Sequence, residues 1–208
     1  MVKTFHVKEG MRLGCASSAT QIEGGETDSS WNDWFHRGMI KDNANPAFAC
    51  EHYERYEEDF ALMAELGVRE YRLGIEWSRI QPAPDEFDDE AMAHYRAMLQ
   101  KLLSLEIRPL LTLHHFTNPM WFERQGGFES SSSIACFLKF VEYVVRHIGD
   151  LVSEYVTINE PNVYVTNGWF FGSWPPGKKD FSAACKVFEN LACLLYTSDA
   201  ADDLIGVD

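Results

Sequence analysis

The sequence has no uninterrupted apolar run of transmembrane length, and its first residues, MVKTFHVKE, carry no apolar stretch long enough for a secretory signal. Positive charge is scarce, because 18 Lys and Arg stand against 32 Asp and Glu, a formal net charge of -14. Nucleic acids and anionic membranes are bound by clustered Lys and Arg, so we expect neither as a partner. The composition, 46% hydrophobic and 24% charged, predicts a soluble globular protein of the cytoplasm.

Cysteine spacing excludes the common metal motifs. The five cysteines are scattered, with no Cys-x-x-Cys pair and no Cys/His grouping at zinc spacing, so we expect no metal and no cofactor. Reduced thiols in the cytosol are the simplest interpretation of an odd, scattered set. Glycine-rich phosphate loops are missing as well, which disfavours nucleotide binding.

Four apolar, strand-like segments alternate with helical patterns. The segments are 12–17, 70–75, 108–113 and 155–158, and the helical patterns are 53–66, 88–104, 133–147 and 181–192. Alternation of this kind predicts an α/β fold with a parallel sheet, either doubly wound or a (β/α)8 barrel. A complete barrel takes about 250 residues or more. With four strand–helix units, the 208 residues are predicted to form the N-terminal half of a (β/α)8 TIM barrel.

Polar residues follow the last of these segments. In such barrels the chemistry sits at the C-terminal ends of the strands, and 155–158 runs directly into Asn159, Glu160 and Pro161. Pro161 ends the strand and can open a helix at its first turn. A carboxylate held at a strand end suits a general acid, although for this motif alone a solvated glutamate at a strand-to-helix turn is the better explanation.

Five motifs in one order carry a resemblance to a known family. They are 13–25 (LGCASSATQIEGG), 30–35 (SWNDWF), 71–80 (YRLGIEWSRI), 113–119 (LHHFTNP) and 157–162 (TINEPN). Together they resemble family 1 glycoside hydrolases, which are retaining β-glycosidases, over about residues 5 to 192. The resemblance implies a β-glucosidase type of activity on small β-glycosides or oligosaccharides. It leaves the oligomeric state open.

The resemblance also implies roles for individual residues. Glu160 matches the acid/base, and Asn159 matches the residue that hydrogen-bonds the sugar 2-OH, a contact that strengthens at the transition state. Arg72 matches the arginine beside the nucleophile. Gln21 and His115 match residues that bind hydroxyls of the glycone. His114 is interpreted as a structural residue.

Two tryptophans are more ambiguous. Trp121 and Trp169 are candidates for stacking on a leaving-group sugar, although tryptophan is equally common in a protein core.

The sequence departs from the family pattern at several positions. Phe116 stands where the family usually has Trp, Thr117 where it usually has Asp, and Phe128 where it usually has Trp. The family's nucleophile lies in a Glu-Asn-Gly motif, and this sequence contains none. We therefore expect these residues to end before the nucleophile. Residues 193–208 depart from the family altogether and are predicted to be a non-native tail, leaving 1–192 as the half-barrel.

Two other functions stay open at this point. One is an endo-glycanase of another barrel family, in which Asn-Glu-Pro also occurs, and the segment from Gln21 argues against it. The other is a non-catalytic sugar-binding or structural protein, against which the presence of Glu160 argues.

Overall fold

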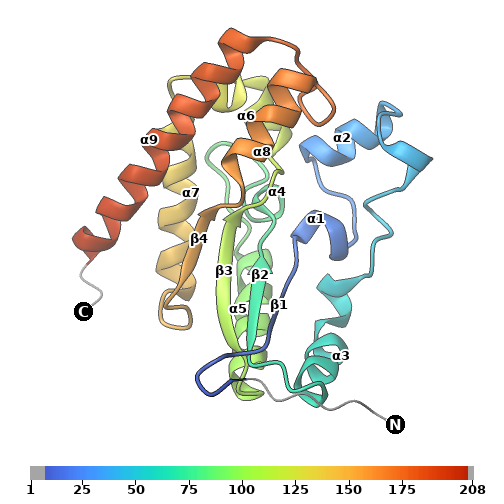
Figure 1. Ribbon diagram of the computed structural model, residues 1–208, viewed down its shortest axis with the longest axis vertical. Helices are drawn as coiled ribbons and strands as arrows, with labels where there is room; N and C mark the ends of the chain where they lie inside the picture. Colours follow the sequence, from blue (N-terminus) through green and yellow to red (C-terminus); the bar gives the residue numbers. More distant parts are fainter. Residues whose placement is uncertain (1–7, 206–208) are drawn as a thin grey trace.

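A four-stranded parallel sheet forms the centre of the molecule in the computed structural model, which describes residues 8–205 (Figure 1). Its strands are β1 (Gly14–Ala16), β2 (Glu70–Gly74), β3 (Arg108–His114) and β4 (Tyr155–Ile158). They are hydrogen-bonded in the order β1-β2-β3-β4. All four strand-like segments of the sequence are therefore confirmed as strands.

The strand order decides between the two candidate architectures. A doubly wound sheet reverses its strand order at a switch point, whereas here each new strand is added on the same side of the previous one. Long helices connect the strands: α3 (His52–Glu65), α5 (Asp89–Ser104) and α7 (Ser133–Ile148), with α9 (Phe181–Ile205) after β4. The fold is the N-terminal half of a (β/α)8 barrel.

Short helices gather at and beyond the carboxyl ends of the strands, from the middle to the top of Figure 1. They are α1 (Ala19–Ile22), α2 (Ser30–His36), α4 (Trp77–Ile80), α6 (Met120–Arg124) and α8 (Pro161–Val165). Two 3-10 turns, η1 (Lys41–Asn43) and η2 (Gly127–Glu129), and a π-helical turn, η3 (Thr166–Phe171), complete this layer. Pro161 opens α8 at its first turn, as the sequence predicted.

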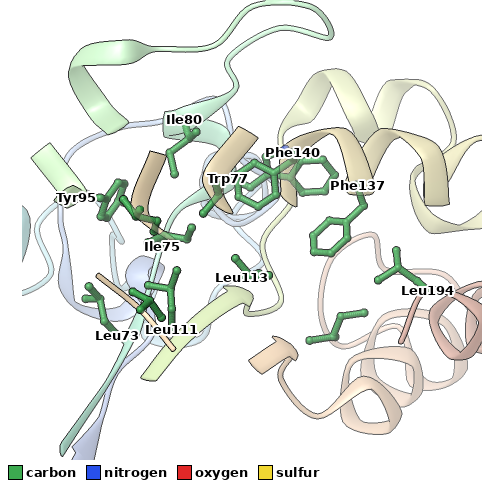
Figure 2. Close-up of a cluster of buried hydrophobic side chains, with 14 of the residues drawn as sticks. Leu73, Ile75, Trp77, Ile80, Tyr95, Leu111, Leu113, Phe137, Phe140 and Leu194 are labelled. Carbon is green, nitrogen blue, oxygen red and sulfur yellow. The ribbon is translucent and has the colours of Figure 1, made fainter. Parts of the chain in front are cut away.

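The main core lies between the sheet and the long helices. Side chains alternate across each strand, so Tyr71 and Leu73 of β2 point into the core while Arg72 points to the other face. Trp77, 1% exposed, packs against Phe137 and Phe140 of α7. Figure 2 shows these rings beside Leu111 and Leu113 of β3. This packing leaves the second face of the sheet available for polar residues.

Helix α9 runs without a break through residue 193, the start of the predicted non-native tail. Leu194 is fully buried against the core, next to Leu191. The non-native origin of residues 193–208 stays a prediction. Within residues 8–205, none of the helices combines the length and the apolar character that a membrane span requires.

Candidate functional site

Polar residues from all four strand–helix units meet at the carboxyl edge of the sheet. Gln21 lies in α1, just after β1, and Arg72 lies in β2 itself. His115 follows the last residue of β3, and Asn159 and Glu160 follow β4. Parallel strands place all their carboxyl ends at one edge of the sheet. Residues 21 and 160, which are 139 positions apart in the sequence, therefore belong to one site.

A charge-assisted hydrogen bond joins β2 to the residue that follows β4. The Nη1 atom of Arg72 donates to Oδ1 of Asn159 at 2.7 Å, across the face of β3, which lies between the two strands. Asn159 is 6% exposed, and its Nδ2 atom donates to Oε2 of Glu160 at 3.5 Å. Because Arg72 fixes the amide oxygen of Asn159, the amide nitrogen is directed toward the carboxylate.

Glu160 itself has an uncommon backbone. Its φ and ψ of 42° and 60° lie in the left-handed region, where a residue with a Cβ is strained by about 1 kcal/mol or more. The following Pro161 disfavours the right-handed helical region for Glu160, which accounts for part of this choice. The result is an exposed carboxylate that stands at the N-terminus of α8 beside a buried amide. Phe116, after β3, is left-handed too, with φ 67°.

His115 is a neutral imidazole near neutral pH. Burial, and then the positive charge of Arg72, lower its pKa from 6.5 to about 4. Its buried Nδ1 atom has no hydrogen-bond partner among residues 8–205. A neutral imidazole can both donate to and accept from a hydroxyl group.

His114 is structural, in agreement with the sequence analysis. It is 1% exposed, and its Nε2 atom lies 2.9 Å from Oδ1 of Asn118. Burial lowers its pKa to about 4 as well. Its ring packs edge-on against Phe128 and Tyr164 in the core.

Gln21 and His115 line a cavity of about 370 Å³. Three aromatic side chains form another part of its wall: Trp31, Phe116 and Trp174. The ring of Phe116 lies 5.0 Å from that of Trp174, and Nε1 of Trp31 donates to the backbone oxygen of Phe116 at 3.0 Å. Polar groups beside aromatic faces suit a polyhydroxylated ligand, whose hydroxyls and C–H faces need both.

The structure corrects the sequence prediction for Trp121 and Trp169. Trp121 is 8% exposed, packs edge-on against Trp77, and donates from Nε1 to the backbone oxygen of Gln81 at 2.8 Å. Trp169 is 1% exposed and donates to Oε1 of Glu129 at 2.5 Å. Both rings belong to the protein core, so neither offers a face to a sugar.

Sequence reasoning missed two features of this region. Trp31 stands in the motif 30–35, but the motif does not show that its ring lines the cavity, and nothing in the sequence pointed to Trp174. The second feature is a cluster of ionisable groups, in which Tyr95 donates to the buried Glu23 and Arg79 lies 3.4 Å from it. Glu23 and Arg79 stand in the motifs 13–25 and 71–80, but nothing in the sequence places them side by side.

In the part of the chain that the structure describes, no three His, Cys, Asp or Glu side chains are grouped to hold a metal ion. What the site offers is one exposed carboxylate, a buried amide tied to an arginine, and a neutral imidazole beside a hollow.

Comparisons with known proteins agree with the five motifs. The sequence model described as glycosyl hydrolase family 1 matches residues 3–199. A relative named beta-glucosidase A, from Acetivibrio thermocellus, is 35% identical over 207 residues. That match covers 93% of this chain and 46% of the relative, so the chain spans about half the length of that curated relative.

Solved structures show the same relation. An AHE enzyme from Alicyclobacillus herbarius superimposes with a TM-score of 0.87 at 30% identity, covering 94% of this chain and 45% of that one. A beta-glucosidase from Thermotoga maritima, solved in complex with glucoimidazole, has a TM-score of 0.84 at 30% identity. In that case 88% of this chain and 43% of the other are covered.

Proposed function

Because the chain belongs to glycosyl hydrolase family 1, we propose that it carries the acid/base half of the active site of a retaining β-glycosidase of the β-glucosidase type. Glu160 is the general acid, which protonates the leaving oxygen of a β-glycoside. In the second step the same carboxylate takes a proton from the attacking water. The substrates are small β-glycosides or oligosaccharides, as the name of the Acetivibrio thermocellus relative suggests.

The observation that carries this proposal is the linked series Arg72, Asn159 and Glu160. A 2.7 Å hydrogen bond to Arg72 fixes the amide of Asn159 beside the carboxylate. An amide held in this way can bind the sugar hydroxyl next to the reacting carbon while Glu160 reaches the leaving oxygen. Proximity and orientation of this kind reduce the barrier without any new covalent chemistry.

Gln21 and His115 support a glycone site beside these groups. Both line the cavity, and the neutral His115 presents a buried nitrogen with no partner among residues 8–205. A hydroxyl of a bound sugar would satisfy that nitrogen. The amide of Gln21, which is exposed to the cavity, offers a donor and an acceptor for a second hydroxyl.

Double displacement also requires a nucleophilic carboxylate about 5 to 5.5 Å from the acid/base. No Glu-Asn-Gly motif occurs in the 208 residues. The nearest string begins at Glu189 in α9, where Asn190 instead donates to the backbone oxygen of Phe128 at 2.7 Å. We propose that the nucleophile lies outside these residues, so that this chain alone has one carboxylate of the pair.

An activity assay tests the missing nucleophile. The purified 208-residue chain is expected to give no measurable turnover of an aryl β-glucoside. Turnover that disappears in the Glu160→Gln variant would show that the chain holds a complete catalytic pair, and the assignment of the nucleophile elsewhere would then be wrong.

A binding experiment tests the glycone site. Glucoimidazole, the ligand of the Thermotoga maritima structure, is titrated into the isotope-labelled chain, and NMR signals are followed. We expect saturable changes at the side chains of Gln21, His115 and Asn159, and a loss of binding in Gln21→Ala. Gln125→Ala, at an exposed glutamine of the same chain, is the matched control. Absence of binding by the unaltered chain would contradict the proposal.

A further inference from the structure

Two threonine hydroxyls are in contact at the candidate site. The Oγ1 atoms of Thr20 and Thr117 lie 2.6 Å apart. Thr20 is in α1, after β1, and Thr117 follows β3. Strands β1 and β3 are not neighbours, because β2 lies between them in the sheet. The pair therefore joins two loops that the sheet itself does not connect.

A buried carboxylate supports this pair from the strand in between. Glu76, just after β2, is 4% exposed, and its Oε2 atom accepts from Oγ1 of Thr20 at 3.1 Å. Its Oε1 atom accepts from the backbone nitrogen and the hydroxyl of Ser78, at 3.2 and 2.7 Å. Three donors thus converge on one carboxylate, an arrangement that holds the side chain of Glu76 in a single position.

The number of hydroxyl hydrogens determines which group donates in each hydrogen bond between Thr117, Thr20 and Glu76. Each threonine hydroxyl has one hydrogen to donate. The hydrogen of Thr20 goes to Glu76, so the short contact to Thr117 requires the hydrogen of Thr117 to point at Thr20. Thr117, 6% exposed, also lies 3.3 Å from the backbone oxygen of His115, a longer and weaker contact for the same hydrogen.

The position of the pair links it to the two cavity residues. Thr20 directly precedes Gln21 in a helix of four residues, whose N-terminal Ser18 makes no side-chain capping bond. Thr117 comes two residues after His115, beyond the left-handed Phe116. Displacing either hydroxyl moves a short backbone segment whose adjoining side chain lines the cavity.

We propose that Thr20 and Thr117, with Thr20 hydrogen-bonded to Glu76, are positioning residues. They set the distance between Gln21 and His115, and this distance decides how well both side chains reach the hydroxyls of the glycone. The ligand they serve is the pyranoside of the proposed function, on which this inference rests. Thr20 is part of the cavity wall, whereas Thr117 is not among the residues that line it, and the hydroxyl of Thr20 is engaged by Glu76 and Thr117. Their contribution is to hold two binding groups, from loops after non-adjacent strands, at one fixed spacing.

The test compares hydroxyl removal with hydroxyl retention. Thr20→Val and Thr117→Val keep the side-chain shape and remove the hydroxyl, whereas Thr20→Ser and Thr117→Ser keep the hydroxyl. Thr112→Val is the matched control, because Thr112 is fully buried and its hydroxyl has no partner among residues 8–205. Each variant of the 208-residue chain is studied by NMR without ligand and by titration with glucoimidazole.

We expect either valine variant to displace the signals of the Gln21 amide and the His115 ring in the free protein. Glucoimidazole affinity should fall about tenfold, which corresponds to the loss of about one hydrogen bond between the protein and the ligand. The double valine variant should bind about as weakly as either single one, because the two hydroxyls act as one contact. Serine variants should bind as the unaltered chain does, and Thr112→Val should change neither readout.

Two results would overturn the inference. The first is that the signals of Gln21 and His115 do not move in the valine variants. The second is that the serine variants bind as weakly as the valine variants, because the methyl groups and not the hydroxyls would then hold the two side chains. Failure of the proposed function looks different. In that case the unaltered chain does not bind glucoimidazole, yet the ligand-free signals still report whether the hydroxyl pair holds the two side chains.

Discussion

Glu23 is a buried carboxyl group whose ionisation should make the stability of this protein fall as the pH rises. It is 4% exposed, and Oη of Tyr95 donates to its two oxygens at 2.8 and 2.9 Å. Burial is the largest cause that raises its pKa from 4.5 to about 8, against the opposing charge of Arg79. Replacement by glutamine keeps the shape and an acceptor for Tyr95 but cannot ionise.

Arg79 does not cancel the effect of burial because its charge is shared. Its Nε atom lies 3.4 Å from Oε2 of Glu23, while Nη2 donates to the backbone oxygen of Gly24 at 2.9 Å. The guanidinium also lies over the ring of Tyr53, 4.0 Å from its centroid. Glu76 adds a second negative charge nearby, which raises the pKa of Glu23 further.

The sign and size of the effect follow from proton linkage. Between the unfolded pKa of 4.5 and the folded pKa of about 8, the native state binds the Glu23 proton and the unfolded state releases it. The stability gained from the neutral form is therefore complete below pH 4.5 and is lost as the pH rises through about 8. The free energy of unfolding should fall by about 1 kcal/mol from roughly pH 6.5 to 7.5.

The pH range of the experiment matters because His114 and His115 act in the opposite direction. Their pKa values are lowered from 6.5 to about 4, so their contribution to stability is lost as the pH falls from 6.5 toward 4. At pH 6.5 half of the unfolded imidazoles are still charged, and only above about pH 7.5 are both groups almost entirely neutral in the folded and the unfolded chain. The difference between the unaltered chain and Glu23→Gln isolates Glu23, because both chains carry the same histidines.

The assay is urea unfolding of the unaltered chain, Glu23→Gln and Glu65→Gln at intervals across this range. Glu65→Gln removes one negative charge at an exposed position of α3 and controls for net charge. With rising pH, the unaltered chain and the control should lose stability relative to Glu23→Gln, which lacks this titration. If all three curves run parallel, Glu23 is ionised against Arg79 in the native state and the reasoning from burial is refuted.

Three further predictions concern stability and are checked by urea unfolding at constant pH. Trp77→Ala empties a site that is 1% exposed and should cost about 4 kcal/mol; an unchanged midpoint would contradict its place in the core. Gly177→Ala puts a Cβ 2.5 Å from Cη2 of Trp34 at a φ of +80°, and should cost at least about 2 kcal/mol. Gly38→Ala is the control, because Gly38 has a φ of +71° but no atom within 4 Å of an added Cβ, and it should cost only about 1 kcal/mol. Equal losses in the two glycine variants would disprove the steric contribution of Trp34. Asn118→Ala removes a hydrogen-bond partner from the buried His114 and Tyr164 and from the half-buried Glu123, and should lower the free energy of unfolding by about 3 kcal/mol. A loss smaller than that of Gly38→Ala would contradict this.

Local sequence patterns predicted most of the fold. The apolar segments 12–17, 70–75, 108–113 and 155–158 marked the four strands, and the helical patterns between them marked the long helices. The ends of the strands also identified the candidate site, because parallel strands must finish at one edge. These inferences succeeded because they depend only on residues close together in the chain.

Tertiary packing determined which tryptophan rings are buried in the core and which line the cavity. Trp121 and Trp169 satisfy the same local pattern as a sugar-binding tryptophan, yet both are enclosed by the core, while Trp31 and Trp174 line the cavity. A ring is buried or exposed according to what surrounds it from distant segments. No spacing within the sequence contains that information.

Periodicity and motifs, which are local features of the chain, were enough to predict the parallel strand–helix order, the family and the strand-end position of Glu160. The groups that meet across the sheet, Arg72 with Asn159 and Thr20 with Thr117, are known from the folded structure alone. The folded structure also shows that Glu23 is buried beside a shared arginine. Those contacts join non-adjacent strands and loops, and their distances exist only once the helices have packed on the sheet.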